Sequence, residues 1–245
     1  MTPLTRQTIT ELRRAVDTRG PQWAFGIAIA GGLVLSLVVP GGTSGTFDHF
    51  VSGVSIGLPF LAGLLAVMAF TADWTTRAAL TTFVLTTSRP RVLVARYLAV
   101  LCLTVGSLIA IHLIGALVFV MLRPDSASSV FTAETVRQFG AMAATTVASA
   151  LTAMAVGGLV LRTAPAIVVA VFAPLLLTIG LAFAPTVLEW ANPYGFAGWL
   201  ASPNWNWTVP QEESVGLGPA LTSFTIWTAV PVVLGWFRQM RAEPR

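Results

Sequence analysis

The sequence lacks lysine altogether and contains one cysteine, Cys102. A single cysteine excludes an internal disulfide framework and any metal site that needs several cysteines. The absence of lysine excludes a phosphate-binding loop of the type GxxxxGK followed by Ser or Thr, because the lysine of that loop must reach the β- and γ-phosphates. If ATP drives this protein, we therefore expect a different chain to hydrolyse it.

Charge is also scarce, since 10% of the 245 residues are charged, whereas a soluble domain carries about 25%. Hydrophobic residues make up 55% of the chain, and the mean hydropathy is +0.79. These values exclude a soluble globular protein. Six uncharged stretches each exceed the roughly 20 residues that cross a bilayer as a helix. Together they leave no room for a separate soluble catalytic domain.

We predict an all-α, polytopic membrane protein with a single transmembrane domain over residues 1–245. Its six spans are expected at residues 22–39, 50–70, 92–121, 138–161, 165–188 and 216–237. A seventh uncharged stretch, residues 190–211, is not counted as a span, because three prolines and three asparagines interrupt it. We expect residues 189–213 to form an extracellular, interfacial segment that presents Trp190, Tyr194, Trp199, Trp205 and Trp207.

The arginines indicate the orientation, because short cytoplasmic loops retain Arg and translocated loops lose it. With six spans, the side that holds both termini carries twelve arginines, and the opposite side carries only Arg123 and Arg137. We therefore predict a plasma (inner) membrane protein of a prokaryote with both termini, including the tail at 238–245, in the cytoplasm. The pI near 10.5 reflects this orientation and not a nucleic-acid partner, because the arginines are scattered over short loops. Glu11 and Asp17 disfavour a cleaved signal peptide.

The N-terminal segment, residues 1–21, is predicted to contain a short interfacial helix at 8–18. Thr8 and Glu11 have capping-box spacing, and Gly20-Pro21 is expected to break the helix before the first span. The apolar stripe and the positive charges of such a membrane-surface helix are Ile9, Leu12, Val16, Arg6, Arg13, Arg14 and Arg19. The alternative is a charged tail that only fixes the topology.

Residues 73–88, between the second and third spans, are predicted to form a short amphipathic helix. Asp73 is placed to cap this helix, and Pro90 disfavours helix at Arg89 and so separates it from the next span. One side of the helix presents Leu80, Phe83, Val84 and Thr87. This edge could rest on the membrane while threonines and arginines face a partner. The alternative is a helical turn that only connects two spans.

The segment resembles the first cytoplasmic loop of ABC-2 type permeases, the membrane subunits of a class of ATP-binding-cassette exporters. In that family an acidic-aromatic pair starts a helix, a Thr-Pro-x-x-Arg-like motif ends it, and a basic residue heads the third span. The matching residues are Asp73-Trp74, Thr86-Thr87-Ser88-Arg89-Pro90-Arg91 and Arg96. The sequence departs from the pattern with Asp73 for the commoner Glu, Arg77-Ala78 for Gly-Thr, and Thr87 for Pro.

The resemblance implies the ABC-2 (type V exporter-like) permease fold: an elbow helix, six spans, cytoplasmic termini, and an extracellular segment that dips into the membrane surface before the last span. An aromatic-rich outer loop lying on the lipid headgroups is the alternative for that segment. The resemblance also implies that the helix at 73–88 is a coupling helix that docks on an ATPase. Its coupling residues would be Asp73, Trp74, Arg77, Leu80, Phe83, Val84, Thr87, Ser88, Arg89 and Arg91.

By the same resemblance, the chain would supply an export pathway for a drug, antibiotic, polyketide or lipid and would have no catalytic residue and no metal site. Its partners would be two cytoplasmic ABC ATPase subunits, a second permease copy or sister permease, and membrane lipid, with no nucleic acid. ATP and Mg would bind the ATPase, and no cofactor would bind this chain.

The spans as predicted contain no firmly embedded acid or arginine, which counts against an ion-coupled secondary transporter. A stand-alone channel or facilitator needs no such group and stays an alternative. His112 in the third span is expected to be a neutral, hydrogen-bonded interior residue. An intramembrane enzyme is disfavoured, because His112 and Cys102, ten residues apart, are the only nearby pair that could supply a base and a nucleophile.

Glycines and prolines indicate how the spans pack and bend. Gly53 and Gly57 form a GxxxG pattern, which favours close contact between helices. Pro59, Pro174 and Pro231 fall within the second, fifth and sixth spans, where a proline is expected to kink the helix.

Overall fold

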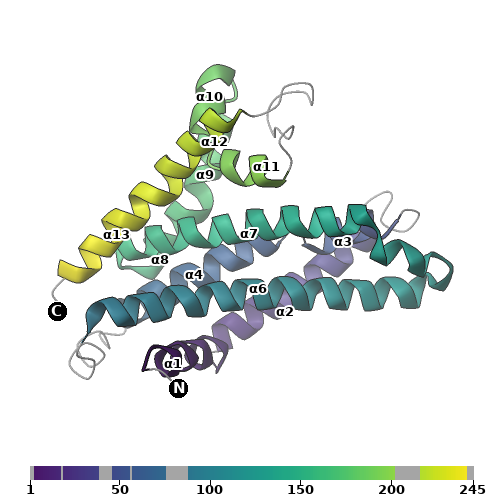
Figure 1. Cartoon of the computed structure of the whole chain (residues 1–245), viewed down its shortest axis with the longest axis horizontal. Helices are drawn as coiled ribbons and strands as arrows, with labels where there is room; N and C mark the ends of the chain where they lie inside the picture. The colour runs from purple at the N-terminus through teal and green to yellow at the C-terminus, as the bar shows by residue number, and fades with distance from the viewer. Residues whose placement is uncertain are drawn as a thin grey trace.

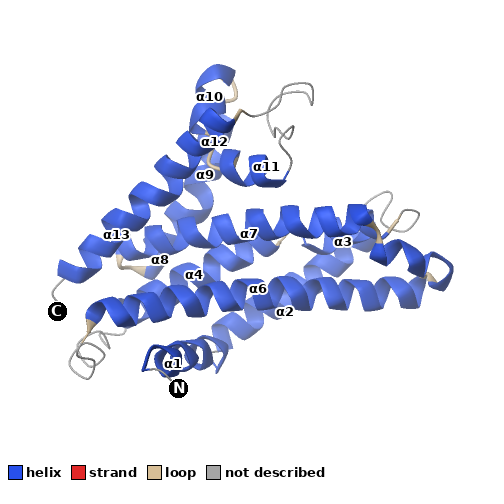
Figure 2. Ribbon diagram, in the orientation of Figure 1, coloured by secondary structure: helices blue, strands red, loops and turns tan. Residues whose placement is uncertain are grey.

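A computed structural model describes residues 3–17, 19–38, 46–55, 57–75, 88–201 and 216–241. Over these ranges the chain forms helices and no strand (Figure 2). Six helical runs are long and apolar enough to cross a membrane: Arg19–Val38, Phe47–Thr75, Arg89–Leu122, Thr135–Val160, Thr163–Gly180 and Leu217–Arg241. The prediction of an all-α chain with six apolar spans is confirmed, and these helices mark the chain as a multi-pass membrane protein.

The first four spans are separate helices, except that the second consists of two. In chain order, the elements of this part are α1 (Pro3–Asp17), α2 (Arg19–Val38), α3 (Phe47–Ser55), α4 (Leu58–Thr75), α6 (Arg89–Leu122), the 3-10 helix η1 (Pro124–Phe131) and α7 (Ala133–Val160). The second span consists of α3 and α4. The helix is interrupted between them, one residue before α4, which contains Pro59. This break lies close to Pro59, the residue at which a kink was expected.

The last two spans each contain a π-helical turn. Their elements and those between them are α8 (Thr163–Ile167), η2 (Val168–Phe172), α9 (Ala173–Gly180), α10 (Pro185–Ala191), α11 (Gly195–Ala201), α12 (Leu217–Phe224), η3 (Thr225–Ala229) and α13 (Val230–Arg241). Each π-turn ends shortly before a proline, Pro174 or Pro231. A wider turn there moves the carbonyl at position i−4 away from the proline ring, which would otherwise clash with it.

The fifth span is shorter than predicted. It ends at Gly180 and not near residue 188, because a turn over 181–183 separates it from α10, which Pro185 begins. Proline is favoured in the first turn of a helix, where its missing N–H needs no partner. The uncharged stretch therefore contains the end of one helix and the start of another.

The N-terminal helix also differs from its prediction. α1 begins at Pro3, so Thr8 lies inside the helix, and its hydroxyl donates to the carbonyl of Leu4 at 3.0 Å and does not cap the N-terminus. Gly20 and Pro21 belong to the first turn of α2 and do not precede it. Proline is tolerated at that position for the reason given for Pro185. α1 thus ends at Asp17 and α2 begins at Arg19, ahead of Gly20-Pro21.

Tight helix contacts fix the first two spans against each other. A Cβ atom on Gly32 of α2 would lie 2.2 Å from the carbonyl oxygen of Val54, and one on Gly53 would lie 2.8 Å from the Cα atom of Ser36. Gly57, by contrast, has no atom of the described residues within 4 Å of such a Cβ. The predicted GxxxG therefore contributes one contact glycine, Gly53, and its partners on α2 are Gly32 and Ser36.

The described helix ends nearest the two termini and nearest the two loops predicted on their side lie at one end of the bundle. Thr71 near the end of α4 and Thr163 at the start of α8 have hydroxyl oxygens 2.8 Å apart. Arg89 at the start of α6 donates to the carbonyl of Met240 near the C-terminus at 3.0 Å. Figure 1 shows the N-terminal helix, the start of α6 and the C-terminus at this end. An even number of spans requires that arrangement.

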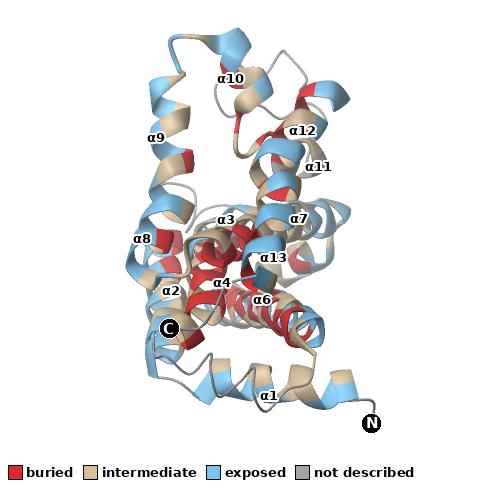
Figure 3. Ribbon diagram, turned by 90° about the vertical axis from the view of Figure 1, so that its left-hand side faces the viewer, coloured by how far each residue is buried: buried red, intermediate tan, exposed pale blue. Residues whose placement is uncertain are grey.

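The first four spans pack as one layered group, and the last two lean away from it. Two buried clusters hold the group, one around Phe50 and Phe119 and one around Phe70 and Met154. Figures 1 and 3 show α9, α10 and α12 rising away from α4, α6 and α7, while α8 and α13 stay close to the group. The fifth and sixth spans therefore diverge from the others toward their α10 and α12 ends.

Candidate functional site

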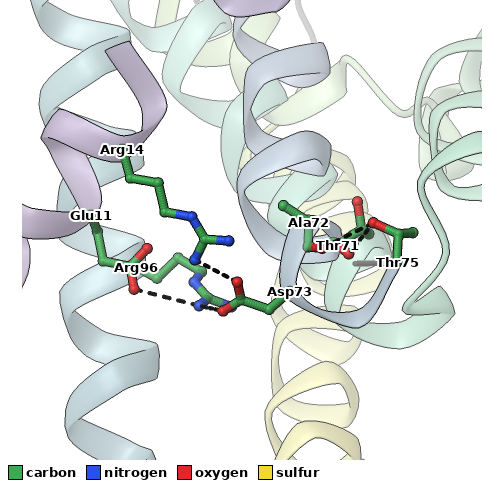
Figure 4. Close-up of polar contacts among 7 residues, drawn as sticks. All are labelled: Glu11, Arg14, Thr71, Ala72, Asp73, Thr75 and Arg96. Carbon is green, nitrogen blue, oxygen red and sulfur yellow. Dashed lines mark hydrogen bonds and ion pairs between the residues drawn. The ribbon is translucent and has the colours of Figure 1, made fainter. Parts of the chain in front are cut away.

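Four charged side chains from three helices meet at the end of the bundle that holds the termini (Figure 4). Arg96 of α6 places its Nη2 atom 2.5 Å from Oδ2 of Asp73, which belongs to α4. The same Nη2 atom lies 3.4 Å from Oε1 of Glu11 on α1. Arg14 of α1 forms an ion pair with Oδ1 of Asp73. We call Glu11, Arg14, Asp73 and Arg96 the ion cluster.

Each member reaches the ion cluster because of its place in its helix. Asp73 is in the last turn of α4, which ends at Thr75, and Arg96 is about two turns into α6. Glu11 and Arg14 are three residues apart on α1, so they project from the same face of that helix. α1 packs mainly against α6 and so brings this face to the cluster. Figure 4 shows the two α1 side chains directed toward Asp73 and Arg96.

The centre of the ion cluster is buried. The side chain of Arg96 is 1% exposed and that of Asp73 is 3% exposed, whereas that of Arg14 is 41% exposed. Removing a carboxylate or a guanidinium from water is strongly unfavourable unless an opposite charge lies close by. Two arginines face two carboxylates here, so the formal charge of the group is balanced. Arg96 Nε and Nη1 are buried without an acceptor among the described residues, which makes the contact with Asp73 its main compensation.

The ion cluster corrects one prediction. Asp73 does not begin a helix after the second span, because α4 continues to Thr75 and the carboxylate pairs with arginines. Asp73 and Arg96 are buried within the protein near the ends of the second and third spans. Asp73 pairs with Arg96 and does not cap a helix because a buried guanidinium needs a counter-charge more than a helix N-terminus needs a cap.

Five of the ten predicted coupling residues lie outside the described residues, and the other five flank that segment. Arg77, Leu80, Phe83, Val84 and Thr87 lie in that segment, 76–87. Asp73 and Trp74 are in the last turn of α4, Ser88 precedes α6, and Arg89 and Arg91 belong to the first turn of α6. The third span begins at Arg89, and Pro90 is the second residue of α6. Pro90 was expected to keep Arg89 out of the helix, but proline is tolerated in the first turn.

The predicted elbow residues lie on α1. Ile9 and Leu12 are half-buried, and Val16 is 47% exposed; Arg13 and Arg14 are exposed. The apolar stripe therefore turns partly inward, where α1 packs on α6 and α2. Glu11, predicted as half of a capping box, pairs with Arg96 and was missed as a member of a charged site. A signal existed, because an arginine inside an apolar span needs a nearby carboxylate.

The segment between the fifth and sixth spans folds back onto the bundle. α11 packs against α7 and α12, and α10 packs against α12. Ser223 of α12 donates its hydroxyl to the carbonyl of Asn192 at 2.6 Å and accepts from the backbone N–H of Phe196 at 3.3 Å. Trp227 donates its indole N–H to the carbonyl of Ala191 at 2.9 Å. The sixth span thus holds residues 191–196 in place.

Three of the five aromatic residues predicted for this segment lie among the described residues, and two lie outside them. Trp190 lies near the end of α10 with 48% of its surface exposed, and Tyr194 and Trp199 are partly buried. Trp205 and Trp207 lie outside the described residues. Tyr194 lies between α10 and α11, where burial raises the pKa of its phenol above the ordinary value.

A cavity of about 600 Å³ lies between residues of the second to sixth spans and residues 193–196. His112 borders it, with Nδ1 2.9 Å from the carbonyl of Leu108 and the ring packed edge-on against Phe139 at 4.8 Å. His112 is therefore hydrogen-bonded to its own helix, as predicted. Among the described residues, no three side chains of His, Cys, Asp or Glu lie close enough to hold a metal ion.

Comparisons with protein-family models, with curated proteins and with solved structures found no match for this chain. Its function is therefore inferred from its residues and their arrangement. Two features stand out in that arrangement: the ion cluster at the end that holds the termini, and the cavity between the spans.

Proposed function

We propose that this chain is the membrane subunit of an ATP-driven exporter of the ABC-2 type, and that it forms the pathway for a hydrophobic or amphipathic substrate. Two cytoplasmic ATPase subunits supply the energy, and a second permease, identical or related, completes the assembly. The observation that carries the proposal is the ion cluster, because it fastens α1, the end of α4 and the start of α6 together on either side of segment 76–87.

A lever that transmits force from a partner needs firmly held ends. Asp73 lies two residues before the end of α4, and Arg96 lies seven residues after the start of α6. Their buried contact makes the two helices move as one body near the segment that joins them. A partner that pushes on segment 76–87 therefore displaces the second and third spans together, and α1 with them. This is the mechanical requirement for coupling nucleotide-driven closure to the bundle.

The charge of this end supports a cytoplasmic partner. Arg91, Arg238 and Arg241 are exposed at the end that holds the termini. An excess of arginine marks cytoplasmic loops, and a positive surface favours docking of a partner with a negative one. Energy must come from such a partner, because the chain has no lysine for a phosphate-binding loop.

The test is co-purification in mild detergent with the ATPase encoded beside this chain. Wild type should retain the ATPase in stoichiometric amount, and Phe83→Asp/Val84→Asp should lose it while still eluting as a folded species. The matched control is Phe131→Asp/Val136→Asp, which makes the same changes at side chains that are 92% and 70% exposed at the α6–α7 turn, far from the ion cluster. Retention of the ATPase by the control and its loss by the first variant support the proposal.

Two results would reject the proposal. If wild type retains no ATPase, the chain is not a subunit of this kind of exporter. If both double variants retain it equally, the segment at 76–87 is not the docking element. Transport assays in liposomes that contain both subunits complete the assignment. A fluorescent substrate should move only when ATP is present on the side of the membrane that holds the ATPase.

A stand-alone facilitator is the second candidate, and the cavity is the observation that favours it, because side chains of this one chain line the space. A facilitator moves substrate down its gradient and needs no ATP. Liposomes that contain this chain alone distinguish the two functions. Flux in those liposomes, unchanged by added ATPase and ATP, would favour the facilitator.

A further inference from the structure

The cavity lies where the last two spans diverge from the first four, and its walls are mainly apolar. Side chains from α7, α9 and α12 form much of the wall, among them Met142, Leu175 and Phe224. Its volume of about 600 Å³ is within the range of pockets that hold drug-sized molecules. Figure 1 shows the divergence of α9 and α12 from α7, with α11 lying between them.

One end of the cavity carries polar atoms that lack partners. Ser55 is 1% exposed, and its hydroxyl has no hydrogen-bond partner among the described residues. The side-chain amide of Gln138 reaches Ser52 through Nε2 at 3.3 Å, and its Oε1 atom is buried without a partner in the same part of the chain. All three residues line the cavity.

The unpartnered hydroxyl of Ser55 is unusual within this protein. Several other buried hydroxyls have a partner: Ser36 donates to the carbonyl of Leu33 and Thr71 to that of Val67, both at 2.8 Å, and Ser223 donates to the carbonyl of Asn192. Water is scarce inside a bilayer, so a polar group left alone there is unfavourable. Ser55 gives up this local bond and faces the cavity instead.

Ser55 and Gln138 lie close enough to act on one ligand group. Ser52 and Ser55 are three residues apart on α3 and therefore neighbours on the same face of that helix. Gln138 of α7 already contacts Ser52. Its amide oxygen can accept a hydrogen bond, and the serine hydroxyl can donate or accept one. A hydroxyl or amide group of a ligand meets both requirements.

We propose that the cavity binds a compact amphipathic molecule whose uncharged hydrogen-bonding group, a hydroxyl or an amide, contacts Ser55 and Gln138 while its apolar body lies along Met142, Phe196 and Phe224. The assignment of this ligand as the transported substrate rests on the proposed function. The cavity size favours a single-chain or drug-like molecule over a two-chain membrane lipid.

Photolabelling of the full-length chain in lipid nanodiscs tests this site. The probe is 1-dodecanol that carries a diazirine in its chain, and the competitors are 1-dodecanol, dodecane and dioleoylglycerol. Adducts are mapped by mass spectrometry. We expect labelling of Met142, Phe196 or Phe224 that 1-dodecanol suppresses and that dodecane and dioleoylglycerol do not, because dodecane lacks the hydroxyl and dioleoylglycerol is too large.

Two variants test the polar contacts. Ser55→Ala and Gln138→Leu should each weaken competition by 1-dodecanol about five- to tenfold, the effect of one hydrogen bond in a buried site. Ser107→Ala is the matched control, since Ser107 is also buried, bonds to the carbonyl of Thr104 at 2.9 Å and lies outside the cavity lining. Ser55→Ala removes an unpartnered group, so it should not lower the thermal unfolding midpoint.

Several results would overturn the inference. Labelling confined to lipid-facing residues, equal suppression by dodecane, or unchanged competition in both variants would each remove the polar contact. Suppression by dioleoylglycerol would place a two-chain lipid in the cavity. A disulfide between Leu175→Cys residues of two chains, in a Cys102→Ser background, would place a second copy there. Labelling uses this chain alone and so does not depend on an ATPase. Labelling of the cavity without recovery of an ATPase would reject only the exporter proposal. Recovery of the ATPase without labelling of the cavity would reject only the cavity ligand.

Discussion

Arg96 of the third span and Asp73 of the second are joined by a contact of 2.5 Å between Nη2 and Oδ2, and both side chains are buried. Each residue is at the end of its span nearest segment 76–87. α6 is about 51 Å long at 1.5 Å per residue, longer than the roughly 30 Å hydrocarbon core. Its first turns can therefore lie near the headgroups, where a buried ion pair is less unfavourable than at the bilayer centre.

Asp73→Asn should destabilise the protein strongly, because it leaves the guanidinium of Arg96 buried without its main counter-charge. Breaking a buried ion pair on one side typically lowers stability by about 3–5 kcal/mol. Asp17→Asn is the matched control, since Asp17 is exposed at the end of α1. The midpoint of thermal unfolding, followed by size-exclusion fluorescence, should fall for the first variant and stay unchanged for the second.

A double variant separates the loss of a charge partner from the loss of packing. Asp73→Asn/Arg96→Met removes both charges and keeps a side chain of comparable length at position 96. It should be more stable than Asp73→Asn alone, since no buried charge is left unpaired. If the double variant is as unstable as the single one, packing and not charge explains the role of this pair.

Gly32→Ala should disrupt the contact between the first two spans. The added Cβ would meet the carbonyl oxygen of Val54 at 2.2 Å, so one helix must shift, at a cost of about 1–3 kcal/mol. Gly31→Ala is the control, because a Cβ at Gly31 meets nothing within 4 Å and alanine favours a helix over glycine by about 1 kcal/mol. Thermal midpoints that shift in opposite directions are expected, and equal shifts would contradict the close crossing.

The number of spans could be predicted from the sequence because it depends on composition alone. A run of apolar residues long enough to cross a bilayer must form a helix there, since no other backbone arrangement satisfies its own hydrogen bonds. The ends of the spans were harder to predict from the sequence. The uncharged stretch that contains Gly180 and Pro185 continues through a turn, and no charged residue marks the boundary.

The ion cluster could be predicted only in part. Asp73 and Arg96 were recognised as the two flanks of one loop, but their pairing depends on how α4 and α6 pack, which no local pattern encodes. Glu11 is 85 residues from Arg96 along the chain, and its capping-box spacing with Thr8 indicated a local role instead. The cavity was beyond prediction for the same reason, because its lining residues come from five spans.

Ser223→Ala should loosen the segment between the last two spans. The hydroxyl of Ser223 bonds the carbonyl of Asn192 and the N–H of Phe196, so its removal leaves two backbone groups without that partner, at about 1–3 kcal/mol. Limited proteolysis should cut the variant faster within residues 191–201. Thr222→Ala removes a hydroxyl that bonds the carbonyl of Gly218 within its own helix, so this variant should be cut at the wild-type rate. Equal rates for all three proteins would mean that Ser223 does not hold the segment.

Single cysteines should reveal which end of the bundle faces the cytoplasm. Cys102→Ser removes the native thiol, and Ser128→Cys and Thr10→Cys then place exposed thiols on η1 and on α1, near opposite ends of the third span. The arginine distribution predicts that a membrane-impermeant maleimide labels Ser128→Cys in intact cells. Thr10→Cys should react only after the membrane is permeabilised. The opposite pattern would place segment 76–87 outside the cell, where no ATP-driven partner could act on it, and the proposed function would fail with it.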